Sequence, residues 1–111
     1  MATFSSLQKK ALAFPEVREE PHFDKTSFRV GGKIFATFNV KTGLACLKLS
    51  PSDQDVFSLV APGRIYPVPN AWGKQGWTFV EIKAIHAAQL SALLKAAYTG
   101  VAAAKRSART K

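Results

Sequence analysis

Two adjacent glycines, Gly31-Gly32, stand between two stretches in which apolar and polar residues alternate, residues 26–30 and 34–40. Glycine accepts the positive φ angles that two-residue hairpin turns need, and alternation on both sides of such a turn indicates paired antiparallel strands. A second tight connection, residues 41–43, leads to a third alternating stretch. We therefore expect residues 22–49 to form a three-strand antiparallel meander.

Helical spacing flanks this meander. Residues 3–14 predict a short helix that Pro15 ends, and Ser50-Pro51 predicts the start of a second helix, because serine caps a helix and proline suits its first turn. We expect Val56, Phe57 and Val60 to form the buried side of this second helix. Residues 87–104 predict a third helix with one apolar stripe, made of Leu90, Leu93, Leu94, Ala97, Tyr98 and Val101.

The remaining segments complete an α+β fold. Alternation predicts a strand at 77–82, and we expect an extended strand at 17–23 that enters the meander, with Pro21 near an edge or bulge. Two prolines confine residues 64–69 to an edge strand or a loop, and two glycines favour a flexible loop at 70–76. We expect a two-layer sandwich, an antiparallel sheet of about five strands with the N- and C-terminal helices packed on one face. A chain of 111 residues holds one such domain, which we place at 1–104, before a disordered basic tail at 105–111.

Alternation also divides the strand residues between two faces. One set is apolar and would face the helices: Ile34, Ala36, Phe38, Leu47, Leu49, Val80 and Ile82. The opposite set would be Arg29, Lys33, Phe35, Lys48, Trp77 and Phe79. Cations among large aromatic rings suit three roles: stacking bases while neutralising phosphates, forming a partner interface, or packing lysine stems over rings to stiffen the sheet.

The charge of +9 is unevenly distributed. Residues 21–50 hold five basic residues and one acidic residue, and residues 101–111 hold four basic residues and no acidic one. Such asymmetry favours polyanionic partners, nucleic acid first and an anionic membrane second, although a basic protein can also owe its charge to solubility alone.

The sequence contains no recognisable catalytic set. His22 and His86 have no nucleophile at a familiar spacing, and His22 with Asp24 is better suited to a turn hydrogen bond. There is no Cys/His metal cluster or phosphate-binding glycine loop, so we expect no enzyme, metal or cofactor. We expect Cys46 to be a packing residue. A single cysteine cannot form an internal disulfide, so we also expect a location in the reducing cytoplasm. We also expect neither a signal peptide nor a membrane span.

The run from His22 to Ala36, with Ser-Phe-Arg-Val-Gly-Gly-Lys-Ile-Phe-Ala at its centre, resembles the MmcQ/YjbR-like family. Leu47-Lys48-Leu49 and Trp77 with Val80 extend the likeness, which runs from the first helix to Tyr98. The resemblance implies a small bacterial α+β domain similar to the frataxin-type sandwich, and a DNA-binding-like assignment. Relatives often carry His directly before the tryptophan, where this chain has Gly76. Frataxin-type iron binding needs an acidic ridge, which this basic sequence lacks.

We therefore expect a non-enzymatic protein that binds double-stranded DNA with little sequence preference. The residues expected to contact phosphates are Arg29, Lys33, Lys48, Arg64 and Lys74, and the aromatic residues beside them are Phe35 and Trp77. The basic tail would add non-specific attraction. The alternative is a protein–protein or small-ligand binding module that uses the aromatic and basic sheet face and the region of Tyr66 and Trp77.

Overall fold

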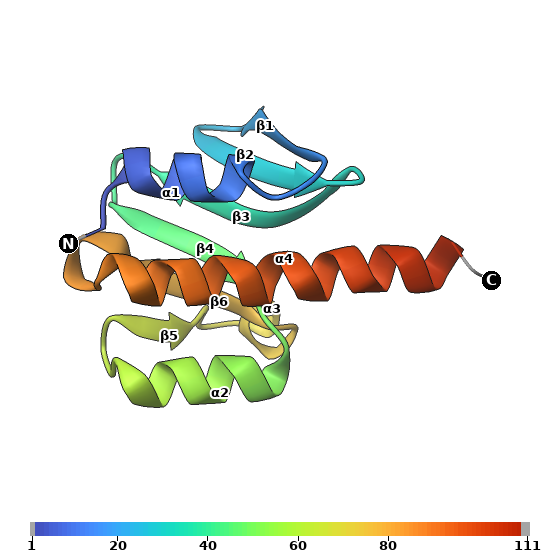
Figure 1. Cartoon of the computed structure of the whole chain (residues 1–111). Coiled ribbons are helices and arrows are strands. Elements are labelled where there is room, and N and C mark those ends of the chain that lie inside the picture. Colours follow the sequence, from blue (N-terminus) through green and yellow to red (C-terminus); the bar gives the residue numbers. More distant parts are fainter. Residues whose placement is uncertain (1, 110–111) are drawn as a thin grey trace.

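The computed structural model describes residues 2–109, with side chains over 2–103. The elements, in chain order, are α1 (Phe4–Leu12), β1 (Val17–His22), β2 (Lys25–Val30), β3 (Lys33–Asn39), β4 (Leu44–Lys48), α2 (Pro51–Val60), β5 (Ile65–Pro67), α3 (Ala71–Lys74), β6 (Trp77–Glu81), the 3₁₀ turn η1 (Ile82–Ala84) and α4 (Ala87–Arg109) (Figure 1).

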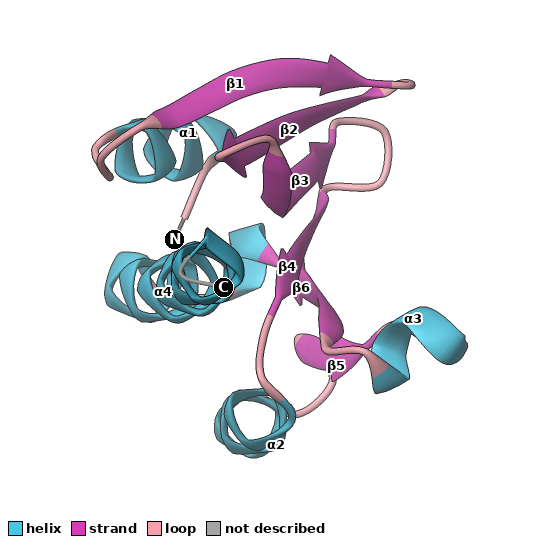
Figure 2. Cartoon of the chain, turned by 90° about the vertical axis from the view of Figure 1, so that its right-hand side faces the viewer, coloured by secondary structure: helices cyan, strands magenta, loops and turns pink. Residues whose placement is uncertain are grey.

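The strands form one six-stranded sheet in the order β1-β2-β3-β4-β6-β5, and every neighbouring pair is antiparallel. Figure 2 shows α1, α4 and α2 on one side of the sheet and α3 on the other. The α+β class, the meander and the helix-covered face are thus confirmed. The sixth strand is β5, and its Pro67 and the Pro21 of β1 both lie in edge strands, where a missing N–H costs no ladder hydrogen bond.

The helices begin where their capping residues stand. Thr3 and Ser6 form a capping box at α1, and the hydroxyl of Ser50 accepts a hydrogen bond from the Asp53 N–H at α2, with Pro51 in the first turn. The apolar stripe of α4 is buried against the sheet, and its leucines, 90, 93 and 94, have no exposed surface. None of the helices among residues 2–109 has the length and apolarity that crossing a membrane would require.

The C-terminal tail differs from expectation in its backbone. Helix α4 continues through Arg109 instead of ending before Lys105. Alanine, lysine and arginine are good helix formers, so the segment has no residue that would stop the helix. Residues 110 and 111, also part of the expected tail, lie outside the described residues.

The expected buried side of α2 is wrong. Val56 and Val60 are 57% and 60% exposed, whereas Gln54 is buried and Phe57 is half-buried. The helix packs against β5, a three-residue strand at the sheet edge, so only a narrow strip of its surface is covered. The Gln54 side chain amide is the group that anchors it, because it donates to the carbonyls of Gly73 and Trp77 and to the Thr78 hydroxyl.

Residues 70–76 are also not the flexible loop that we expected. They contain α3, and the Asn70 side chain accepts a hydrogen bond of 2.8 Å from the Trp72 N–H at its start. Gly73 and Gly76 serve close packing: a Cβ at either would overlap a backbone carbonyl oxygen, that of Val68 or of Leu49. Gly76 also has a φ of +105°, which favours glycine. The two glycines therefore hold α3 tightly against the sheet edge.

Candidate nucleic-acid interface

Strand β3 contains a one-residue bulge at Phe35. Phe28 of β2 lies opposite Ala36, yet the next residue, Arg29, lies opposite Ile34, so Phe35 has no partner in β2. One extra residue inverts the alternation of faces along the strand. The bulge therefore exchanges the faces of Ile34 and Phe35 relative to the simple alternation of the sequence.

The expected positions of these two residues are accordingly wrong. Phe35 points toward the helices, fully buried, with its ring centroid 5.6 Å from that of Tyr98 and 6.5 Å from that of Phe14. Ile34 is half-buried and lies in register with Arg29 on the outer face, meaning the face turned away from α1 and α4. Phe35 is a core residue and cannot stack on a ligand.

Cross-strand register brings basic and aromatic residues together at one end of the outer face. Arg18 of β1 pairs with Arg29 of β2, which pairs with Ile34 of β3, and Lys48 of β4 pairs with Trp77 of β6. Facing side chains on neighbouring strands lie close enough to act together. One end of the sheet therefore presents a row of side chains with three cations.

This row of side chains is interrupted between β3 and β4, because the two strands separate there. Their pairing runs from Asn39 with Leu44 to Ala36 with Leu47, and β4 does not pair with residues 33–35. Figure 1 shows the two strands separating beyond that point. A hollow of about 660 Å³ opens there, which we call the wedge hollow; its lining includes Arg29, Lys33, Ile34, Lys48, Trp72 and Trp77.

The lining of the wedge hollow combines three positively charged side chains with a largely apolar surface. Arg29, Lys33 and Lys48 supply three positive charges, and none of the described residues that line it is acidic. Lys33 lies opposite the buried Val30 at the hairpin tip and not on the outer face as expected, yet its exposed side chain borders the same hollow. Such a lining is suited to an anionic ligand that carries an apolar group.

The tryptophans contribute differently to this lining. The Lys48 Nζ lies 5.9 Å from the centroid of the Trp77 ring and donates a hydrogen bond to the Gln75 carbonyl oxygen, so the cation covers Trp77 and ties β4 to α3. Trp72 on α3 is 58% exposed. It therefore keeps ring surface available to a ligand.

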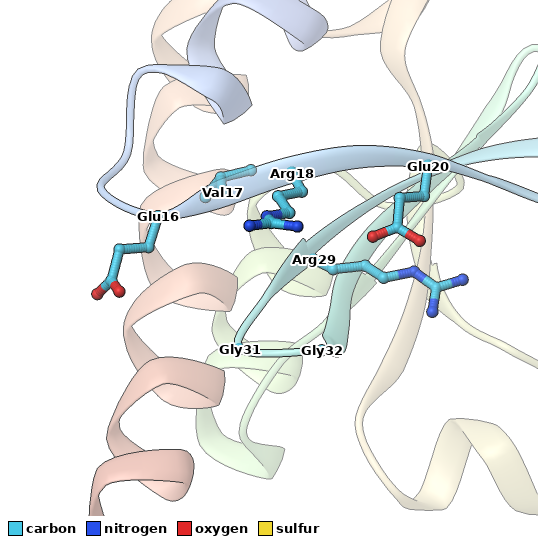
Figure 3. A pocket seen from close by; sticks show the side chains of 7 residues that line it. All are labelled: Glu16, Val17, Arg18, Glu20, Arg29, Gly31 and Gly32. Atoms are coloured by element: carbon cyan, nitrogen blue, oxygen red, sulfur yellow. The ribbon is translucent and has the colours of Figure 1, made fainter.

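A second hollow, of about 430 Å³, adjoins the first and shares Arg29 and Gly32 with it. Arg18 and Arg29 line it, together with Glu16 and Glu20 (Figure 3). The Arg29 Nε donates to the Ser27 hydroxyl over 3.1 Å, and that hydroxyl donates to the Glu20 carbonyl oxygen over 2.8 Å. Because its charges are mixed, this hollow favours anions less than the wedge hollow does.

The structure groups part of the expected site. Arg29, Lys33, Lys48 and Trp77 all line the wedge hollow, and the exposed Lys74 is on α3, one residue from the lining residue Gln75. Arg64 lies at the opposite end of the sheet, where its carbonyl accepts from the Glu81 N–H.

Three residues that contribute to the two hollows were not among the expected site residues, and one of them, Ile34, had been assigned to the helix-facing set. Ile34 needed knowledge of the bulge, and Arg18 was passed over because its own segment is electrically balanced. Trp72 stands in a segment that resembled a flexible loop, although Asn70 two residues before it was a readable capping signal. Tyr66, named in the alternative interpretation, packs on Phe79 at 5.8 Å between ring centroids.

Neither an ionised thiol nor a cluster of metal-ligating side chains is found among the residues that the structure describes. Burial raises the pKa of the Cys46 thiol from 9.0 to about 11, although Lys25 opposes the shift, so the sulfur is a protonated thiol at neutral pH and a poor nucleophile. Among residues 2–109, no three His, Cys, Asp or Glu side chains come together as a metal site would need.

The family model YjbR matches residues 12–99. Among solved structures, the chain is similar to the crystal structure of Deinococcus radiodurans protein DR2400, described as a DUF419 domain, with a TM-score of 0.76 and 22% sequence identity. The match covers 88% of this chain and 77% of that one, and it shows a common fold. No curated protein matches the chain significantly.

Proposed function

This chain belongs to the YjbR family, and on that premise we propose that it is a non-enzymatic protein that binds nucleic acid, double-stranded DNA first, with little sequence preference. One observation supports the proposal above all: Arg29, Lys33 and Lys48 converge on a single hollow whose described lining holds no acidic residue. Phosphate contacts of this kind supply affinity through counterion release and carry no sequence information.

Helix α4 argues against sequence readout. A recognition helix needs several polar or basic side chains on an exposed face, but α4 carries a single basic residue, Lys95, between 87 and 103, and its other basic residues, Lys105, Arg106 and Arg109, follow only in its last turns. Binding should therefore be weak and steeply dependent on salt. Cys46 has no second cysteine to pair with, which is compatible with a role in a reducing compartment such as the cytoplasm.

The test is fluorescence anisotropy of a labelled duplex across a salt series. The double variant Arg29→Ala with Lys33→Ala should bind more weakly than wild type, and its log–log salt slope should be shallower by about 1.8, since each phosphate contact contributes about 0.9. The matched control is Lys41→Ala with Lys83→Ala, two exposed lysines toward the opposite end of the sheet whose loss changes net charge equally. A common salt slope for both variants would reduce the effect to net charge, and a wild type that does not bind at low salt would overturn the proposal.

Removing residues 105–111 separates the contribution of the basic C-terminus. We expect weaker binding with the difference between the two double variants preserved, because the wedge hollow remains intact. If the shortened protein no longer distinguished the two double variants, the C-terminus would be the site and the sheet end would not.

A further inference from the structure

We propose that the wedge hollow accepts an unpaired nucleobase, so that the protein prefers nucleic acid with a single-stranded end over fully paired duplex. This inference rests on the proposed function and adds the structural class of nucleic acid that this site recognises. Its observation is the mixed lining of one hollow by two tryptophans, an isoleucine and three cations.

The apolar part of the lining is suited to a base and unsuited to a phosphate. Ile34, Leu49 and Val101 border the hollow beside Trp72 and Trp77. A phosphate group gains nothing from such surface, whereas every base has a flat π-face that stacks on an aromatic ring. Leu49 and Val101 are core residues, 3% and 8% exposed, so phosphate contact alone explains Arg29, Lys33 and Lys48 but gives no role to the exposed ring of Trp72.

Trp72 is the ring best placed to receive the base. Its side chain is 58% exposed, although α3 itself is held firmly by the Asn70 cap and by the Gln54 amide on the Gly73 carbonyl. Trp77 is already covered by the Lys48 ammonium group at 5.9 Å. A rigidly mounted, exposed aromatic residue is a stacking platform that loses little conformational freedom on binding.

The three cations line the same hollow as Trp72, so the phosphates that flank a base stacked on that ring would meet positive charge. Arg29 lines both the wedge hollow and the neighbouring hollow of Arg18, so it marks a path along which a strand can pass from one to the other. Residues 33–35 of β3 do not pair with β4, so this part of the strand borders the hollow through Lys33 and Ile34. Bases in a closed duplex are stacked and paired, and moving one into the hollow costs unstacking energy that a single-stranded end avoids.

The experiment compares a blunt DNA hairpin with the same hairpin carrying a short thymidine overhang. The overhang should raise the affinity roughly tenfold, the effect of one base–aromatic stack. It should also quench intrinsic fluorescence more than the blunt hairpin does, because both tryptophans of the chain line this hollow. The quenching is measured on the wild-type protein and depends on no variant.

The variant Trp72→Ala should bring the ratio of the two affinities, overhang to blunt, close to one, whatever its affinity for the blunt hairpin. Phe23→Ala is the matched control, since Phe23 is an aromatic residue 91% exposed at the turn after β1, away from the wedge hollow. Equal affinities for the two hairpins without extra quenching would overturn this inference and leave the proposed function intact. Binding of neither hairpin at low salt would overturn the proposed function itself.

Discussion

Arg18 and Arg29 are direct cross-strand partners in β1 and β2, so two positive side chains stand opposite each other on the outer face of the sheet. Like charges in such a pair are destabilising, and a bound anion would relieve the repulsion. The ligand-free protein therefore carries a small electrostatic cost at the edge of the proposed interface.

Sulfate should stabilise the protein through this pair. At matched ionic strength, replacing chloride by sulfate should raise the Tm of the wild type more than that of the double variant Arg18→Ala with Arg29→Ala. Sulfate also stabilises proteins generally by exclusion from their surface, so the measurement is the difference between the two increments. Lys41→Ala with Lys83→Ala controls for net charge, and equal increments in all three proteins would contradict the prediction.

The bulge at Phe35 predicts which of two alanine substitutions, at Phe35 or at Ile34, lowers the stability more. Simple alternation of faces would predict the opposite order. Phe35→Ala should lower the free energy of unfolding by about 3–5 kcal/mol, because it empties the packing between β3, Phe14 and α4. Ile34→Ala should cost less, about 1–2 kcal/mol, since that residue is half-buried on the outer face. Urea denaturation of both variants checks the order, and a costlier Ile34→Ala would refute the assigned faces.

Gly76 cannot carry a side chain in this backbone. Gly76→Ala should destabilise by more than about 3 kcal/mol, because its Cβ would overlap the Leu49 carbonyl oxygen in addition to the strain of a φ of +105°. Gly32→Ala is the matched control: its φ is +81°, but no atom lies within 4 Å of the added Cβ, so about 1–2 kcal/mol of backbone strain is expected alone. Chemical denaturation should separate the two, and equal losses would show that overlap at Gly76 is relieved.

Cys46 gives a pH dependence of stability with a defined sign. Burial raises its pKa to about 11, above that of an unfolded thiol near 8.5–9, so the folded protein holds the proton more tightly. The stabilisation is fully present below about pH 8.5 and is lost as the pH rises through 11. The free energies of unfolding of wild type and Cys46→Ala should differ by a constant amount up to about pH 8. Above that pH, the free energy of unfolding of the wild type should fall relative to that of the variant. Parallel curves to pH 11 would contradict the shift.

Local signals determined most of the fold. The Gly31-Gly32 hairpin, the cap at Ser50, and the stripe from Leu90 to Val101 depend on neighbours within a few residues in sequence. They are readable because backbone φ preferences and side chain periodicity act over that short range. The resemblance of the central run to the MmcQ/YjbR-like family agreed with them, and the family match over 12–99 bears it out.

The site depended on contacts that sequence spacing does not express. The bulge that exchanges Ile34 and Phe35 places the large ring of Phe35 edge-on against the stacked rings of Phe14 and Tyr98, residues distant in the chain. The wedge hollow exists because β3 and β4 stop pairing at Ala36, and Trp72 reaches it because Gly73 and Gly76 allow close backbone approach. Alternation within each separate strand assigned Arg29 of β2, Lys48 of β4 and Trp77 of β6 correctly to the outer face. Only the packing of strands and helices against one another decided which side chains share a hollow, since the free energy of burying a ring exceeds the local preference for regular alternation.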